Sequence, residues 1–161
     1  MSGTSKRLEA LYAEHSPWAA RLAYLITQDH ELAQDVTQDA FVRVFGRFRD
    51  RSTPQEFPAY LRKTIVNLCN DAWRRKRIRR LHNVAPDPDA IAPATDLDAR
   101  HDLLTALRRL PVRQRSVLVL KHYEALKERE IADLLGCSVG AVKALTTRGL
   151  ENLRAQVGGM R

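Results

Sequence analysis

The chain of 161 residues has few aromatic residues and only two cysteines. Aromatic residues make up 6% of the sequence, and long β-branched runs are scarce, which argues against a fold built on sheets. Cys69 and Cys137 lie far apart and form neither a disulfide framework nor a CxxC metal motif. None of the five histidines pairs with a cysteine at metal-ligand spacing, so we expect no metal and no cofactor.

Long hydrophobic runs are also missing. No apolar stretch is long enough to cross a bilayer, and the N-terminus begins with polar and charged residues, unlike a signal peptide. The two cysteines lie within apolar patterns and are interpreted as buried, reduced thiols. These features predict a cytoplasmic protein without membrane contact. The hydrophobic fraction of 44% is sufficient for a buried core.

Positive charge is in excess, with 27 Lys and Arg against 19 Asp and Glu, a net charge of +8. Such an excess favours a polyanionic partner, usually nucleic acid, although a protein that is simply basic stays an alternative. Residues 1–80 hold 15 basic and 9 acidic residues, and residues 100–161 hold 12 and 6. Residues 81–99 hold four aspartates, three prolines and no basic residue. The sequence thus predicts two small basic domains, 1–80 and 100–161, joined by a flexible acidic linker, 81–99.

Both domains show apolar residues at helical spacing, which predicts an all-α fold. Helices are expected at about 99–110, 112–123, 127–135 and 138–156 in the second domain. In the first domain, a break or kink is expected at Pro17. The predicted inward stripes of the first domain are Leu8, Leu11, Tyr12, Trp18, Leu22 and Leu25; Leu32, Val36, Ala40, Val44 and Phe48; and Tyr60, Leu61, Ile65, Leu68, Cys69 and Ala72.

Residues 128–147, "EREIADLLGCSVGAVKALTT", have the spacing of a helix-turn-helix. Two crossing helices need a small residue at their contact, here Ala132, and a turn residue that tolerates positive φ, here Gly136. Ser138 can cap the second helix, and Val142 and Leu145 can hold it against the first. An ordinary helical hairpin is the alternative.

The outward face of the second helix then follows from helical spacing. Lys143 and Arg148 can reach phosphates or guanine edges, and the short Ala144 and Thr147 can approach thymine methyls, with Ser138 at the helix start. A solvated helix face is the alternative interpretation of the two cations.

A second basic feature, "WRRKRIRR" at 73–80, holds six Lys and Arg in eight residues. Phosphate neutralisation is the favoured role, and nuclear localisation or solubility the alternative. Asn67, Asn70 and Asp71 lie just before it and could read unpaired bases. Phe57 and Tyr60 could stack on bases, but the spacing of Tyr60 favours the core.

Asp35, Gln38 and Asp39 form an acidic and polar surface within the basic first domain. Such a surface is a poor DNA contact and a plausible protein contact, with solubility as the alternative.

Taken together, these segments resemble the extracytoplasmic-function (ECF) sigma factors of bacterial RNA polymerase, most of all the actinobacterial SigE-like branch. "ELAQDVTQDAFVRVF" resembles the core-binding segment of the family, often written AEDLVQEAFLRVW, and "FPAYLRKTIVNLCNDAWRRKR" its −10-element segment. "LRRLPVRQRSVLVLKHYEALKEREIADLLGCSVGAVK" resembles its region 4. The resemblance covers about residues 8–80 and 100–155 and implies sigma regions 2 and 4 on either side of a linker.

The resemblance implies roles for individual residues. It places the β′ clamp contact on Asp35, Gln38, Asp39, Phe41 and Arg43. It places the melted −10 strand on Asn67, Asp71, Arg74, Arg75 and Arg77, with a flipped-out base in the loop 49–57, and the −35 duplex on Ser138, Lys143, Ala144, Thr147 and Arg148. The acidic linker corresponds to the segment that threads toward the polymerase active site.

The implied function is a promoter-specificity factor rather than an enzyme. Its partners would be core RNA polymerase, through the β′ clamp and β subunits, and promoter DNA, with an anti-sigma factor as a further partner that the family allows. Two departures bear on the −35 preference: Leu145 stands where many members have Arg, and Gly149 falls within the recognition helix. Trp73 and Phe57 do not rebuild the aromatic melting segment of housekeeping sigma factors, so we expect selective promoters and limited melting power.

Two other functions fit parts of the sequence. A stand-alone regulator would bind an operator through the helix-turn-helix and use residues 1–80 as a sensor, but such a sensor needs neither the basic run nor the acidic face. An enzyme acting on nucleic acid lacks support, because the sequence shows no carboxylate cluster, phosphate loop or nucleophile–base pair.

Overall fold

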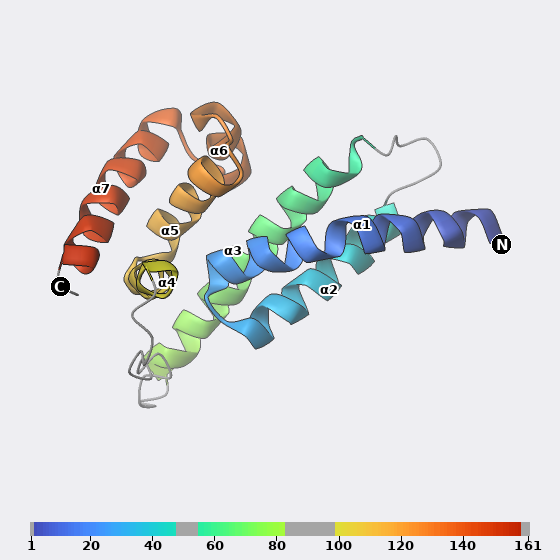
Figure 1. Cartoon of the computed structure of the whole chain (residues 1–161), viewed down its shortest axis with the longest axis horizontal. Helices are drawn as coiled ribbons and strands as arrows, with labels where there is room; N and C mark the ends of the chain where they lie inside the picture. The colour runs from blue at the N-terminus through green and yellow to red at the C-terminus, as the bar shows by residue number, and fades with distance from the viewer. Residues whose placement is uncertain (1, 48–54, 83–98, 159–161) are drawn as a thin grey trace. The chain divides into compact units, whose positions relative to one another are not determined.

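The computed structural model describes residues 2–47, 55–82 and 99–158, and all regular structure within these ranges is helical (Figure 1). This confirms the predicted all-α class. Phe48, most of the loop 49–57 and most of the predicted linker lie outside the described residues. The helices are α1 (Ser2–Thr27), α2 (His30–Arg47), α3 (Phe57–His82), α4 (Ala99–Arg109), α5 (Val112–Leu118), the π-helical segment η1 (Val119–Tyr123), α6 (Glu128–Leu135) and α7 (Val139–Gly158).

Two compact units make up the chain, Met1–Asn70 and Asp71–Arg161. The division falls inside α3, before residue 80, where the sequence places the end of the first domain. The domain limits at residues 80 and 100 stay predictions.

In the first unit, a two-residue connection joins α1 to α2, and the two helices pack side by side (Figure 1). Gln28 takes a positive φ of 55°, and its backbone N–H donates to the Tyr24 carbonyl at 2.7 Å, which ends α1. Asp29 then caps α2, because its Oδ1 accepts the Leu32 N–H at 3.1 Å. The reversal is therefore fixed by local hydrogen bonds.

Pro17 does not break α1, since the helix runs from Ser2 to Thr27; of the expected break or kink, the break is wrong and the kink stays a prediction. A proline inside a helix removes one N–H donor and crowds the carbonyl four residues earlier. That residue, Ala13, is exposed, so water can solvate its carbonyl. Leu11 before the proline and Ala19 and Leu22 after it are buried, so packing on both sides maintains the helix.

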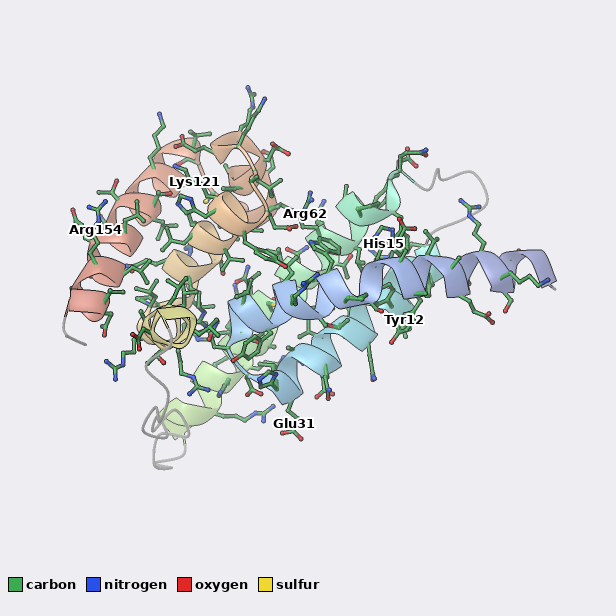
Figure 2. The ribbon with its side chains drawn as sticks, in the orientation of Figure 1. Tyr12, His15, Glu31, Arg62, Lys121 and Arg154 are labelled. Carbon is green, nitrogen blue, oxygen red and sulfur yellow. The ribbon has the colours of Figure 1, made fainter. Side chains whose placement is uncertain are left out.

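The core of the first unit centres on Phe57, which is fully buried at the start of α3. Its ring centroid lies 5.2 Å from His15 on α1, 6.1 Å from Phe41 and 5.7 Å from Phe45 on α2. One aromatic side chain therefore joins all three helices. Figure 2 labels Tyr12 and His15 on α1; the Tyr12 ring meets Phe41 edge-on at 4.8 Å but stays 46% exposed, so its predicted place in the inward stripe is only partly correct.

In the second unit, α7 packs against α4, α5 and α6. Leu107, Leu110 and Leu118 form a buried cluster, against which Leu150 and Leu153 of α7 pack. The predicted single helix over 112–123 is wrong in one detail. After Leu118 the turn widens, because the Glu124 N–H donates to the carbonyl five residues back, on Val119, at 3.1 Å.

A buried arginine closes the end of α4. Arg115 is 4% exposed, and its Nη1 donates to the carbonyls of Leu107 and Leu110 at 3.3 and 3.1 Å. It also donates to the Arg108 carbonyl at 3.3 Å. Helix C-termini leave carbonyls without intrahelical partners, and a cation there is favoured. Arg115 therefore fixes α4 to α5.

Candidate functional site

The turn between α6 and α7 has the geometry that the sequence predicts for a helix-turn-helix. Gly136 ends α6 in the left-handed conformation, at φ 66° and ψ 38°, and the Cys137 N–H donates to the Ala132 carbonyl at 3.0 Å. The Ser138 hydroxyl accepts the Ala141 N–H at 3.0 Å and so caps α7. Ala132 and Val142 are buried. The predicted structural roles of these residues are confirmed.

The opposite face of α7 presents the residues proposed for −35 DNA. Lys143, Thr147 and Arg148 are exposed, and Ala144 is half-buried. The Thr147 hydroxyl donates to the Lys143 carbonyl at 3.1 Å, which leaves its oxygen free to accept. The Lys143 ammonium lies 3.9 Å from a carboxylate oxygen of Glu128. The face thus offers two cations and a short polar side chain.

Gly149 does not belong to this outward face. It is buried, and a Cβ at this position would lie 3.2 Å from Cδ1 of Leu118 on α5. The glycine therefore lets α7 approach α5 closely. Its departure from the family pattern is explained by helix packing inside the second unit, away from the exposed face.

An exposed stripe runs along α3. Asn67, Asp71, Arg74 and Arg75 are exposed and recur at helical spacing, so they share one face. The side chain of Arg77 lies outside the described residues. The single helix α3 thus presents amide, carboxylate and guanidinium groups in line.

The two aromatic residues at the start of α3 have the reverse of their predicted places. Tyr60 is 55% exposed rather than part of the core, and Phe57 is buried rather than free to stack on bases. Tyr60 lies seven residues before Asn67 and eighteen before Ile78, which is 49% exposed, so all three share the stripe. Sequence reasoning missed Ile78 as a surface residue, although its spacing from Asn67 and Arg74 could have shown it.

The acidic and polar face of α2 is also exposed. Asp35, Gln38, Asp39 and Arg43 all reach solvent, and Arg43 Nε pairs with Asp39 Oδ1 at 3.0 Å one turn away. Such exposed ion pairs contribute little to stability, so the face is free to serve a partner.

Two apolar residues modify this picture of α2. Phe41 is 3% exposed and packs against Phe57 in the aromatic core, beneath this exposed face. Val42 is 71% exposed, one turn beyond Gln38 on the same face. Sequence reasoning missed Val42. The available signal was its spacing, because Val42 lies seven residues after Asp35 and four after Gln38, on the same helix face.

Within residues 2–47, 55–82 and 99–158, no group of three His, Cys, Asp or Glu side chains is placed to hold a metal ion. Among the helices described, none is long and apolar enough to cross a membrane.

Comparisons with known proteins agree with this arrangement. The models of sigma-70 region 2 and sigma-70 region 4 match residues 11–79 and 100–153. The RNA polymerase sigma-E factor of Streptomyces avermitilis is 33% identical over 138 residues, which cover 85% of this chain and 77% of that protein. The ECF RNA polymerase sigma factor SigM of Mycobacterium tuberculosis is 30% identical over 165 residues, which cover 98% of this chain and 81% of that protein.

Solved structures show the same fold. CnrH, solved in complex with the cytosolic domain of CnrY, aligns with a TM-score of 0.66 and 26% identity, covering 98% of this chain and 92% of that one. The sigma factor RpoE from Bartonella quintana, solved with the anti-sigma factor NepR, aligns with a TM-score of 0.71 and 22% identity over 97% of this chain and 99% of that one. With its two helical units and these matches, the chain belongs to the sigma-70 family of RNA polymerase sigma factors, in the ECF group.

Proposed function

We propose that this chain directs core RNA polymerase to selected promoters through three separate helix faces. The exposed face of α7 reads the −35 duplex, the stripe on α3 takes the −10 element as a separated strand, and the face of α2 binds the β′ clamp. The observation that carries the proposal is the two-sidedness of α7. Val142 and Thr146 are buried while Lys143, Thr147 and Arg148 are exposed, as a helix lying in the major groove requires.

Each face has the chemistry for its task. Guanidinium and ammonium groups on α7 can donate to guanine O6 and N7 or to phosphates. On α3, Arg74 and Arg75 can neutralise phosphates, Asn67 can hydrogen-bond an unpaired base edge, and Tyr60 offers a ring for stacking. Contacts made only with unpaired bases stabilise the open promoter over the closed one, which is a population shift rather than side-chain catalysis. On this proposal, the protein is a regulatory initiation factor that acts in the cytoplasm.

The α2 face offers carboxylates beside the exposed Val42, which is a combination suited to a protein partner rather than to DNA. Two structurally similar proteins were solved with bound partners. The partner of RpoE is the anti-sigma factor NepR, and the partner of CnrH is the cytosolic domain of CnrY. We infer that an anti-sigma factor binds this chain as well.

Run-off transcription tests the proposal. Core polymerase is supplied with a pool of promoters from the source genome, with and without the full chain. Specific transcripts that need the chain support the proposal, and their start sites define both promoter elements. If core polymerase gains nothing while the chain alone shifts duplex DNA, the stand-alone regulator is the better function.

The −35 assignment has its own mutational test. Replacing Lys143 or Arg148 by Ala should weaken binding of the holoenzyme to −35-containing promoters by about 1–3 kcal/mol for a base contact, and less for a phosphate contact. Co-purification with core polymerase should be unchanged, because α7 lies outside the proposed clamp face. Arg129→Ala, on the exposed surface of α6, is the control for loss of one positive charge. Loss of core binding in the α7 variants would contradict the assignment.

A further inference from the structure

Glu128 lies between two lysines at the start of α6. Its Oε1 is 3.5 Å from Nζ of Lys121 and its Oε2 is 3.9 Å from Nζ of Lys143. Lys121, labelled in Figure 2, belongs to η1, and Lys143 belongs to α7. One carboxylate therefore joins the segment before the helix-turn-helix, its first helix and its recognition helix.

Local structure does not require this carboxylate. The Lys127 N–H at the start of α6 is accepted by Glu130 Oε1 at 3.2 Å, so Glu128 is not needed to cap the helix. The two ion pairs are partly exposed, with Glu128 at 31%, Lys121 at 33% and Lys143 at 66%, so they add little stability. A negative charge beside a DNA-facing lysine also repels phosphates. The dipole of α6 favours a carboxylate in its first turn, but this does not account for the place of Glu128 between two lysines.

We propose that Glu128 is a positioning residue that raises the sequence specificity of α7, an inference that rests on the proposed −35 function. The negative charge of Glu128 weakens the attraction between Lys143 and the phosphates of any DNA. Binding to DNA without a matching −35 element is therefore weakened. An ammonium has three donors. Lys143 can therefore keep its ion pair with Glu128 and still donate to guanine O6 or N7 of a matching −35 element. Glu128 thus suppresses binding to wrong sequences more than binding to right ones.

The experiment compares the wild-type holoenzyme with holoenzyme carrying Glu128→Gln, which keeps the side-chain shape. Affinity is measured across a salt series for a promoter duplex and for the same duplex with a scrambled −35 element. Glu128→Gln should tighten binding to the scrambled duplex and steepen its salt dependence by about 0.9 in slope, the value for one added phosphate contact. Over a fourfold range of salt, one such contact corresponds to roughly a 3.5-fold change in affinity, so the loss of promoter preference should be larger by about that factor at the lowest salt than at the highest.

Two further variants identify the route of the effect. Asp133→Asn removes one negative charge from the exposed surface of the same helix and should leave the preference unchanged. The double variant Glu128→Gln, Lys143→Ala should not bind the scrambled duplex more tightly, because Glu128 acts through Lys143. Matching unfolding midpoints for these variants exclude a folding defect as the cause.

The inference is overturned if Glu128→Gln leaves the scrambled duplex unaffected, if Asp133→Asn does the same as Glu128→Gln, or if the effect persists without Lys143. Failure of the proposed function has a different signature. In that case the wild-type holoenzyme itself shows no preference for the intact −35 element, whatever residue occupies position 128.

Discussion

Arg115 shows how one charged side chain can hold two helices together from inside a core. Its guanidinium donates to three carbonyls at the end of α4, at 3.1–3.3 Å. Arg115→Met keeps most of the apolar stem but removes the donor to all three carbonyls, of which the Leu107 carbonyl keeps the Leu110 N–H at 3.1 Å. We expect the free energy of unfolding of the second unit to fall by about 2–3 kcal/mol, as measured by urea denaturation.

Arg113→Met is the matched control, because Arg113 lies on the same helix and is exposed. Its unfolding free energy should stay within about 0.5 kcal/mol of wild type. Equal losses in the two variants would mean that the three carbonyl contacts of Arg115 contribute nothing.

Helical spacing predicted most of the buried residues. It did not always predict whether a residue at the edge of an apolar helix face is buried or exposed. Tyr60 and Phe57, both near the start of α3, illustrate this limit. Each sits where a helix begins or where two stripes meet, and helical spacing alone allows either face. Phe57 joins α1 and α2 through long-range contacts that no local pattern contains, and burial of its ring leaves Tyr60 outside. The helix-turn-helix residues were predictable because Ala132, Gly136 and Ser138 act through local geometry.

At the scale of elements, the contact between α5 and α7 depends on Gly149. A larger residue there would meet Leu118, which is 4% exposed and packed among other leucines, so it has little room to move. Gly149→Leu should destabilise the second unit by about 1–3 kcal/mol through overpacking. Thermal or urea unfolding of the variant measures this.

Gly140 on the same helix provides the comparison, since a Cβ there meets only Ser138 Oγ at 3.8 Å. Gly140→Leu should not destabilise the second unit and should stabilise it by up to about 1 kcal/mol, because leucine has the higher helix propensity. If the two variants unfold alike, close approach at Gly149 is not the reason for the glycine.

The α2 face allows an element-scale test of polymerase binding. Asp35→Lys with Asp39→Lys should weaken binding to core polymerase at least tenfold, because like charges at a complementary interface cost several kcal/mol. Competition for core enzyme against the wild-type chain measures the effect. The same change in net charge made with Glu9→Lys and Glu14→Lys on the exposed side of α1 should have little effect. If the α2 variant alters only DNA affinity, the clamp assignment is wrong.

At the scale of the whole molecule, the two units have separate cores, one around Phe57 and one around Leu107, Leu110 and Leu118. Damage to one core should therefore leave the other intact. In Gly149→Leu, we expect −35-dependent transcription to fall while core polymerase still co-purifies. Hydrogen exchange should show unchanged amide protection in α1 and α2. Loss of that protection would mean that the units unfold as one.

The two-unit organisation was predictable from the charge pattern, because an acidic, proline-containing stretch separates two basic and periodic ones. The division inside α3 was not. The helical residue pattern of α3 continues without interruption across the division between Asn70 and Asp71. The sequence therefore gives no signal at the point where the first unit ends.

The single helix α3 also has an angular consequence. Each residue turns the helix by about 100°, so the buried residues Leu61, Ile65 and Cys69 fix the direction in which Asn67 and Arg74 point. An insertion or deletion of one residue between Ile65 and Arg74 would rotate the guanidinium groups out of line with Tyr60. Changes in promoter preference along this helix can therefore arise by substitution, whereas changes in its length are restricted to whole turns.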